Sequence, residues 1–290
     1  MDSKEIFLIP AAIVVIVLLA TGPSAAQTTM CESLDQTQRR TAERILNSEY
    51  LYDCCDDTVS RCLVEQPRCR LAVRIADDIC RRVAAGQDEG GVRRALSRRA
   101  RSMMGGGTPA QIDLSNAPVL GPADVPVTVT IYACARCPYC SRLIPLLYDA
   151  VADGELAGRA RIAFRVFPIR GHEGSTEAGL GFAAAAEMND FWPFMMQAYR
   201  HFDEYSAQRQ LDWAQEVGLD REEFAALLAD PATRETLVES KKEGLVNGVE
   251  ETPTFFINGR RWVGDLEFST LVDAIEEEAE RVGGDLWVTD

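Results

Sequence analysis

Two cysteines separated by two residues, in Cys137-Pro138-Tyr139-Cys140, are the side chains whose type and spacing best suit chemistry. An apolar, β-branched run at 127–132 precedes them and a helical pattern follows, so Cys137 stands where a strand gives way to a helix. At a helix N-terminus, free N–H groups and the helix dipole favour the thiolate over the thiol. Two thiols placed in this way can attack and resolve disulfides. A redox site is the leading hypothesis, with a structural disulfide or half of a zinc site as alternatives.

A β-α-β unit is predicted around the two cysteines. Residues 127–132 and 161–167 have the composition of strands, and the helical pattern at 138–152 lies between them. Such a connection makes the two strands parallel through a right-handed crossover. An edge strand is expected near 111–114.

Helices and a hairpin are predicted for the rest of the chain. The pattern from 175 to 246 is helical throughout. Apolar runs on either side of Asn258-Gly259 predict a β-hairpin, because this dipeptide favours a tight two-residue turn. A terminal helix over 266–281 follows.

The order of these features resembles the thioredoxin superfamily, and specifically its DsbA-like branch of thiol:disulfide oxidoreductases. A strand leads into Cys-Pro-Tyr-Cys, a long helical stretch follows, and Thr252-Pro253 then enters the hairpin. The segments 126–147 and 250–259 carry the resemblance, which covers about 111–282 of the sequence.

The spacing within this order favours the DsbA-like branch over thioredoxins and glutaredoxins. Cys137 and Pro253 are 116 positions apart, and those two families have the cysteine and the proline much closer together. The resemblance implies that 175–246 is the helical insertion of the branch. The expected fold is therefore an α/β thioredoxin-like fold with a helical insertion, preceded by a small cysteine-rich all-α domain.

The resemblance implies a role for each residue of the motif. Cys137 would form the mixed disulfide with the substrate, and Cys140 would resolve it. Pro138 and Tyr139 would shape the loop and tune the thiolate. DsbA proteins have histidine where Tyr139 stands, so Cys137 is expected to be a weaker acid and its disulfide less oxidising. Arg136 would act in the opposite direction.

The proline loop and two departures from the family complete the expected site. The resemblance implies that Pro253 is cis and that backbone groups of Thr252 pair with an extended substrate peptide. Many relatives carry a buried acid six residues before the first cysteine, where this chain has Ile131. Glu251 replaces a frequent glycine, and its charge is expected to disfavour acidic peptides.

A third thiol, Cys134, extends the motif to Cys-x-x-Cys-x-x-Cys. It can fill a small position at the strand end, pair transiently with Cys137, or contribute to a site for a soft metal. The chain has two histidines. His172, near the active-site end of the sheet, is interpreted as a surface-loop residue, with an influence on thiol protonation as the alternative. His201 is interpreted as a packing residue.

Six further cysteines fall early in the chain: Cys31, Cys54, Cys55, Cys62, Cys69 and Cys80. They predict three structural disulfides, with a second redox module or a metal cluster as alternatives, and six cysteines allow fifteen pairings. Cys54 and Cys55 can hardly bond to each other, so each is expected to reach a different helix.

A change of charge supports a domain boundary near residue 104. Residues 31–103 carry 14 basic and 12 acidic side chains, whereas residues 104–290 carry 15 basic and 31 acidic ones. We expect a cysteine-rich helical domain over 27–103, a glycine-rich linker over 104–110 and a thioredoxin-like domain over 111–290.

The N-terminus predicts export. An apolar run at 6–20 is followed by a break and by the small residues Ser24-Ala25-Ala26, so 1–26 is interpreted as a cleaved signal peptide. Because Asp2 and Glu5 offset Lys4, an uncleaved membrane anchor is the alternative. The predicted location is the periplasm or another exported compartment, with the protein soluble after cleavage.

The expected activity follows from these features together. The formal net charge of −15 argues against nucleic acid as a partner. The prediction is an exported thiol:disulfide oxidoreductase that acts on protein thiols or disulfides and is recycled by a membrane-bound or soluble redox partner. It needs no metal and no cofactor beyond its redox-active disulfide. The direction of electron flow stays open between oxidase and reductase or isomerase. A thiol-based metal-binding or metal-delivery protein is the alternative from another class.

Overall fold

A five-stranded sheet with the order β2-β4-β3-β5-β6 organises the larger part of the protein. The computed structural model describes residues 29–288, so the predicted signal segment 1–26 lies outside the described residues. The strands are β2 (Val119–Leu120), β3 (Val127–Ala133), β4 (Ala160–Val166), β5 (Thr254–Ile257) and β6 (Arg260–Arg261). β3 and β4 are parallel, as the β-α-β pattern predicted, and the other neighbours are antiparallel.

The edge strand differs from the expectation. Residues 111–114 form no strand, and the short strand β2 begins five residues later and pairs with β4. The side chain of Asp113 accepts a hydrogen bond from the backbone N–H of Ser115 at 2.9 Å, and this local turn competes with sheet pairing. The backbone N–H of Asp113 is bonded instead to the side chain of Glu243, at 3.0 Å.

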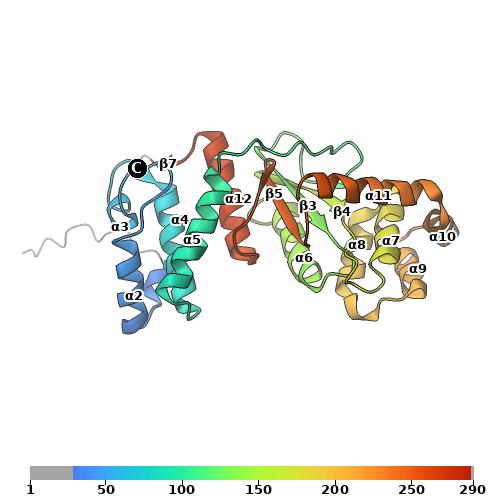
Figure 1. The fold of residues 1–290 in the computed structure, drawn as a ribbon, viewed down its shortest axis with the longest axis horizontal. Helices are drawn as coiled ribbons and strands as arrows, with labels where there is room; N and C mark the ends of the chain where they lie inside the picture. The colour runs from blue at the N-terminus through green and yellow to red at the C-terminus, as the bar shows by residue number, and fades with distance from the viewer. Residues whose placement is uncertain (1–28, 289–290) are drawn as a thin grey trace, which may run out of the picture.

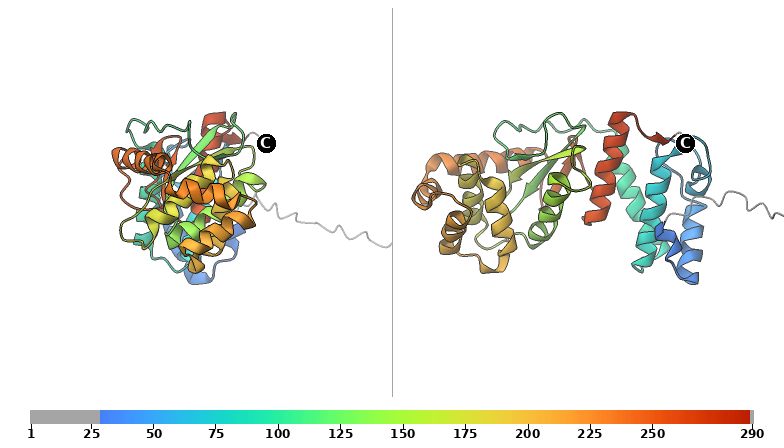
Figure 2. Two further views of the ribbon diagram at one scale, coloured as in Figure 1. Left: turned by 90° about the vertical axis from the view of Figure 1, so that its right-hand side faces the viewer. Right: turned by 180° about the vertical axis from the view of Figure 1, so that it is seen from behind.

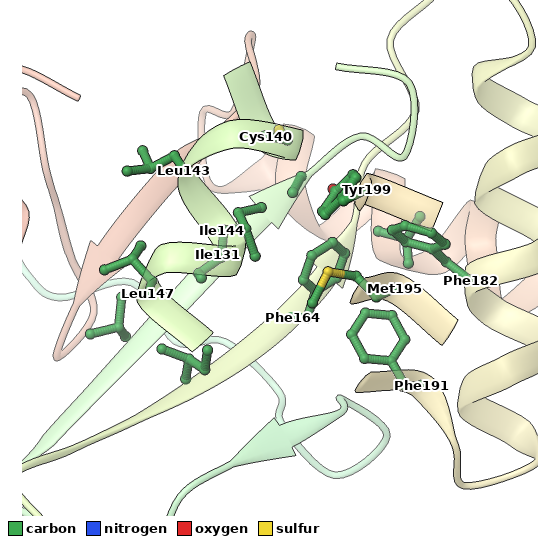
Figure 3. Close-up of a cluster of buried hydrophobic side chains, with 14 of the residues drawn as sticks. Ile131, Cys140, Leu143, Ile144, Leu147, Phe164, Phe182, Phe191, Met195 and Tyr199 are labelled. Carbon is green, nitrogen blue, oxygen red and sulfur yellow. The ribbon is translucent and has the colours of Figure 1, made fainter. Parts of the chain in front are cut away.

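The two faces of the sheet are covered by different helices. Helices α6 (Pro138–Ala152) and α12 (Phe268–Gly283) pack on the face that carries Val127, Val129 and Ile131 of β3. Figure 3 shows Ile144 and Leu147 of α6 beside Ile131 in this core. Tyr132, the next residue of β3, points to the other face of the sheet and lies in a separate buried cluster. Helix α11 (Pro231–Val246) covers this face, and the Tyr132 hydroxyl donates a hydrogen bond to the carboxylate of its Glu243 at 3.0 Å.

The helical stretch predicted over 175–246 forms a bundle at one end of the molecule (Figure 1). Its core is aromatic: the ring of Phe182 packs edge-on against those of Phe191, Phe194 and Tyr199, with centroids 5.5–6.1 Å apart. The bundle consists of α7 (Ser175–Glu187), α8 (Phe191–Arg200), the 3-10 helix η1 (Phe202–Glu204), α9 (Ala207–Glu216), α10 (Arg221–Ala229) and α11.

The cysteine-rich region at the other end is mainly helical and has its own apolar core. Its elements are α1 (Thr29–Glu32), α2 (Gln36–Leu46), α3 (Val59–Cys62), β1 (Arg68–Cys69), α4 (Arg70–Ala84) and α5 (Glu89–Met104). Three disulfides join its six cysteines, namely Cys31–Cys80, Cys54–Cys69 and Cys55–Cys62. The adjacent Cys54 and Cys55 thus reach different elements.

Helix α12 lies between the two regions, as Figure 1 and the reverse view in Figure 2 both show. Its acidic residues face arginines of α4 and α5: Arg74 contacts Glu280 at 2.7 Å, and the buried Arg99 contacts Glu277 at 2.8 Å. The chain then continues into β7 (Trp287–Val288), which pairs with β1. The last described residues therefore lie against the cysteine-rich region and outside the five-stranded sheet.

Within residues 29–288, no helix combines the length and the apolar character needed to cross a membrane.

Candidate active site

Cys137 is the N-cap of α6, and Pro138 occupies the first helical position, where its missing N–H costs nothing. The backbone N–H of Cys137 donates to the carbonyl of Cys134 at 3.1 Å, which closes the turn between β3 and α6. The next two residues of the motif point outward, with Tyr139 64% exposed. Cys137 itself is 1% exposed and Cys140 is fully buried.

The proline loop lies directly against Cys137. Thr254 pairs with Tyr132 in the sheet, and this register brings the loop before β5 to the end of β3. The Thr252–Pro253 bond is cis, and the Cys137 thiol is 3.2 Å from the carbonyl oxygen of Thr252. Residues more than 110 positions apart in the sequence thus meet at one sulfur, as the spacing of a DsbA-like site implied.

The two thiols of the motif have opposite acidities. The pKa of Cys137 is lowered to about 5, mainly because the Cys140 thiol donates a hydrogen bond to its sulfur; burial opposes the shift, and backbone N–H groups and the Thr252 side chain assist it. The pKa of Cys140 is raised well above its ordinary value by burial and by the neighbouring Cys137. At neutral pH, Cys137 is therefore a thiolate and Cys140 a thiol.

Of the three residues expected to tune the thiolate, Pro138 begins α6, and the side chains of Arg136 and Tyr139 point to different parts of the surroundings. The guanidinium of Arg136 lies over the rings of Phe202 and Tyr205, at 4.4 and 4.7 Å, and donates to the carbonyl of Phe202. The Arg136 guanidinium is thus bound to residues of the connection between α8 and α9. Tyr139 projects from the first turn of α6, with the guanidinium of Arg142 5.1 Å from its ring.

Cys134 is fully buried just after β3, and its surroundings raise its pKa, chiefly through burial. Nδ1 of His172 lies 3.4 Å from its sulfur, so this half-buried histidine contacts the third thiol and is more enclosed than the surface-loop interpretation expected. Across residues 29–288, no group of three or more histidine, cysteine or acidic side chains is arranged to hold a metal ion. His201 packs near Trp213, with ring centroids 6.4 Å apart.

Sequence patterns alone did not point to Tyr199. This tyrosine of α8 is 3% exposed, and its hydroxyl donates to the carbonyl of Cys134 at 3.2 Å, inside the turn that precedes the motif. The pattern over 175–246 predicted a helix at this position and assigned no role to Tyr199. Its proximity to the thiols depends on how α8 packs against the end of β3, and no local signal carries that information.

A cavity of about 670 Å³ lies elsewhere, between the 113–119 loop, the edge of β4 and helices α7, α8 and α11. Its lining residues include Arg165, Trp192 and Glu239, and none of the motif cysteines is among them. The redox chemistry and this cavity therefore occupy different parts of the molecule.

Curated relatives match the chain over part of their own length. The Na(+)/H(+) antiporter NhaA 3 of Salinispora tropica is 31% identical over 189 residues, and NhaA 1 of Salinispora arenicola is 29% identical over 185. These matches take in 63% and 62% of this chain and 28% of each antiporter. The chain thus spans under a third of the length of these relatives.

Solved structures and a family model agree on the fold. BdbD of Bacillus subtilis, in its oxidised form, has a TM-score of 0.54 at 19% identity, over 60% of this chain and 98% of that one. The α-DsbA1 protein of Wolbachia pipientis has a TM-score of 0.52 at 19% identity, over 60% of this chain and 96% of that one. The family model Thioredoxin_4, described as thioredoxin, matches residues 114–277. The matched residues make up more than half of the sequence, and the chain therefore belongs to this thioredoxin family.

Proposed function

We propose that this protein is an exported oxidoreductase that exchanges disulfides with protein thiols through Cys137 and Cys140. The observation that carries the proposal is the asymmetry of the pair: a helix-capping sulfur with a pKa of about 5 stands in front of a buried thiol whose pKa is raised. The first sulfur is a ready nucleophile and a good leaving group at neutral pH. The second is protected from solvent until exchange with the first.

The exchange proceeds through a mixed disulfide on Cys137. When the pair is oxidised, a substrate thiolate attacks the Cys137 sulfur and the electron pair of the broken bond leaves on Cys140. A second substrate thiolate then attacks the substrate sulfur, and Cys137 leaves as a thiolate. The Thr252 loop is the surface against which an extended substrate peptide pairs. Because Cys137 is 1% exposed, the substrate sulfur reaches it after a small displacement of the surrounding loops.

The acidity of Cys137 favours an oxidase over a reductase. A pKa of about 5 in place of an ordinary thiol value stabilises the reduced form at pH 7 by about 3 kcal/mol. For a two-electron couple, this makes the disulfide more oxidising by about 60 mV. The direction is that of a dithiol oxidase recycled by a separate redox partner, and a reductase or isomerase is the alternative.

Export is supported by the covalent chemistry of the N-terminal region. Three disulfides within residues 31–80 are typical of proteins that fold in an oxidising compartment. We therefore place the protein in the periplasm or an equivalent compartment, where protein thiols are its substrates.

The test is the reduction potential of the pair, measured on the protein from residue 27 onward by equilibration with glutathione and mass spectrometry of the trapped thiols. A value toward about −120 mV supports the oxidase, and one near about −270 mV indicates a reductase. Cys137→Ser is the control that identifies the couple, because it removes one partner and leaves the N-terminal disulfides intact. The absence of any reversible couple dependent on Cys137 would overturn the proposal.

A further inference from the structure

The resolving thiol, Cys140, must carry charge in a place that disfavours it. It is fully buried, and burial together with Cys137 raises its pKa. Whenever it attacks Cys137 or leaves from it, however, its sulfur is a thiolate. A buried charge without a hydrogen-bond donor is costly. Ile131, which stands where many relatives have a buried acid, is also fully buried and offers no polar group.

Tyr199 brings a hydroxyl to this place from the helical insertion. Figure 3 shows its ring beside the first turn of α6, which carries Cys140. Its hydroxyl donates to the Cys134 carbonyl at 3.2 Å, and the same carbonyl accepts the N–H of Cys137 at 3.1 Å. Among the sulfurs around this hydroxyl, Cys140 has the largest effect on its pKa, which is consistent with the position of the ring beside the first turn of α6. Tyr199 of α8 therefore contacts the turn that positions Cys137 and lies beside Cys140.

The environment keeps this hydroxyl protonated. Burial, followed by the nearby sulfurs of Cys140, Cys134 and Cys137, raises the pKa of Tyr199 well above its ordinary value. A tyrosine in this state does not release its proton near neutral pH. The hydroxyl hydrogen can still turn about the C–O bond and be donated to a different acceptor, since this rotation moves no heavy atom.

We propose that the Tyr199 hydroxyl donates a hydrogen bond to the Cys140 thiolate during disulfide exchange, turning away from the Cys134 carbonyl to do so. Tyr199 thereby supplies a hydrogen-bond donor in a place where the side chain of Ile131 offers none. The inference rests on the proposed function and concerns the second thiol of that site.

Electrons and protons balance in the exchange without any proton transfer to or from Tyr199. In the oxidising direction, the Cys137–Cys140 bond breaks as the bond between the substrate sulfur and Cys137 forms, and Cys140 holds the electron pair. Cys140 then takes a proton made available when the two substrate thiols ionise. The second substrate thiolate releases Cys137 as a thiolate, so the other proton goes to solvent. Tyr199 keeps its own proton throughout.

The test separates the two thiols kinetically in Tyr199→Phe, which keeps the ring. Reduced protein is mixed with oxidised glutathione, quenched in acid and analysed by mass spectrometry. The first step, attack by Cys137, should stay within about twofold of wild type. The second, attack by Cys140 on the mixed disulfide, should slow by about tenfold or more, the effect of losing one hydrogen bond to a charged group. Its pH midpoint should rise by about one unit.

Tyr148→Phe is the matched control. Tyr148 is a half-buried tyrosine on α6 itself, with its ring 5.7 Å from that of Trp192. Removing its hydroxyl should leave both steps and the pH midpoint unchanged. A Tyr199→Phe protein whose second step and midpoint match wild type would overturn the role of Tyr199.

A second substitution keeps the test open if Tyr199→Phe fails to fold. Incorporating 3-fluorotyrosine at position 199 retains the ring and makes the hydroxyl a stronger donor, so the midpoint of the second step should fall below that of wild type. An unchanged midpoint would again contradict the proposal. The two proposals fail in different ways. If wild type forms no mixed disulfide at Cys137, the proposed function is wrong. If wild type and Tyr199→Phe perform both steps at the same rates, only the role of Tyr199 is wrong.

Discussion

At the scale of single residues, the site depends on two thiols that differ in acidity because each shapes the other. The Cys140 thiol donates to the Cys137 sulfur, which stabilises the thiolate of Cys137 and makes ionisation of Cys140 harder. The helix N-terminus contributes backbone donors to the same sulfur. A pKa of about 5 lies between values of about 3.5 and about 7 known for strongly oxidising and for thioredoxin-type cysteines.

Removing the Cys140 donor should make Cys137 a weaker acid. In Cys140→Ala we expect the pKa of Cys137 to rise by about one to two units, because a hydrogen bond to a charged group contributes about 1.5–3 kcal/mol. Thiolate absorbance at 240 nm against pH measures the change. Cys140→Ser, which retains a donor, should shift it less. Equal midpoints in wild type and Cys140→Ala would contradict this account of the acidity.

The same pKa sets how the stability of the reduced protein depends on pH. The folded value of about 5 lies below the unfolded value of about 8.5, so the stabilisation is fully present above about pH 8.5 and is lost as the pH falls toward 5. The reduction potential of the Cys137/Cys140 couple should also depend on pH. Between about pH 5 and about pH 8.5, reduction takes up two electrons and one proton, so the potential should become more negative by about 30 mV for each unit that the pH rises.

At the scale of elements, the sequence pattern correctly predicted those helices, strands and turns that depend on residues close together in the chain. The β-α-β unit followed from two apolar runs around a helix, and the hairpin from Asn258-Gly259, both of which have positive φ in the structure. The expected strand at 111–114 was wrong because Asp113 forms a local turn. The contacts of Tyr199 and His172 with the Cys134 segment arise from long-range packing, which neither composition nor spacing encodes.

The disulfides make a second set of elements whose contributions should differ in size. Cys31–Cys80 closes a span of 49 positions and Cys55–Cys62 one of 7. On loop-closure entropy, the longer bridge should contribute about 4 kcal/mol to stability and the shorter about 2.5 kcal/mol. Double alanine variants of each pair, compared by urea unfolding of the otherwise intact chain, measure the difference.

The same variants test whether the N-terminal disulfides exchange electrons with the active site. A purely structural role predicts that the Cys137/Cys140 potential and the rate of glutathione exchange stay unchanged when either bridge is removed. A clear change in that exchange rate, in a variant that remains folded, would favour the alternative of a second redox module.

At the scale of the whole molecule, the two regions are joined by buried charge. Arg99 of α5 is 1% exposed and reaches Glu277 of α12, whose carboxylate also accepts the hydroxyl hydrogen bond of Tyr52 at 2.7 Å. Asp78 of α4, fully buried, lies 3.6 Å from the same guanidinium. Buried ion pairs of this kind fix the relative placement of elements because neither charge can be left alone.

Breaking this junction should destabilise both regions together. In Arg99→Met we expect the free energy of unfolding to fall by about 3–5 kcal/mol, because Glu277 is left buried without its partner. Urea unfolding followed by tryptophan fluorescence and by circular dichroism measures the loss. Arg99→Met combined with Glu277→Met removes both charges and should recover much of the stability. Lys242→Ala, at an exposed pair with Glu235, is the surface control and should unfold as wild type does. A single Arg99→Met variant as stable as the double variant would mean that the regions are held together by their apolar contacts alone.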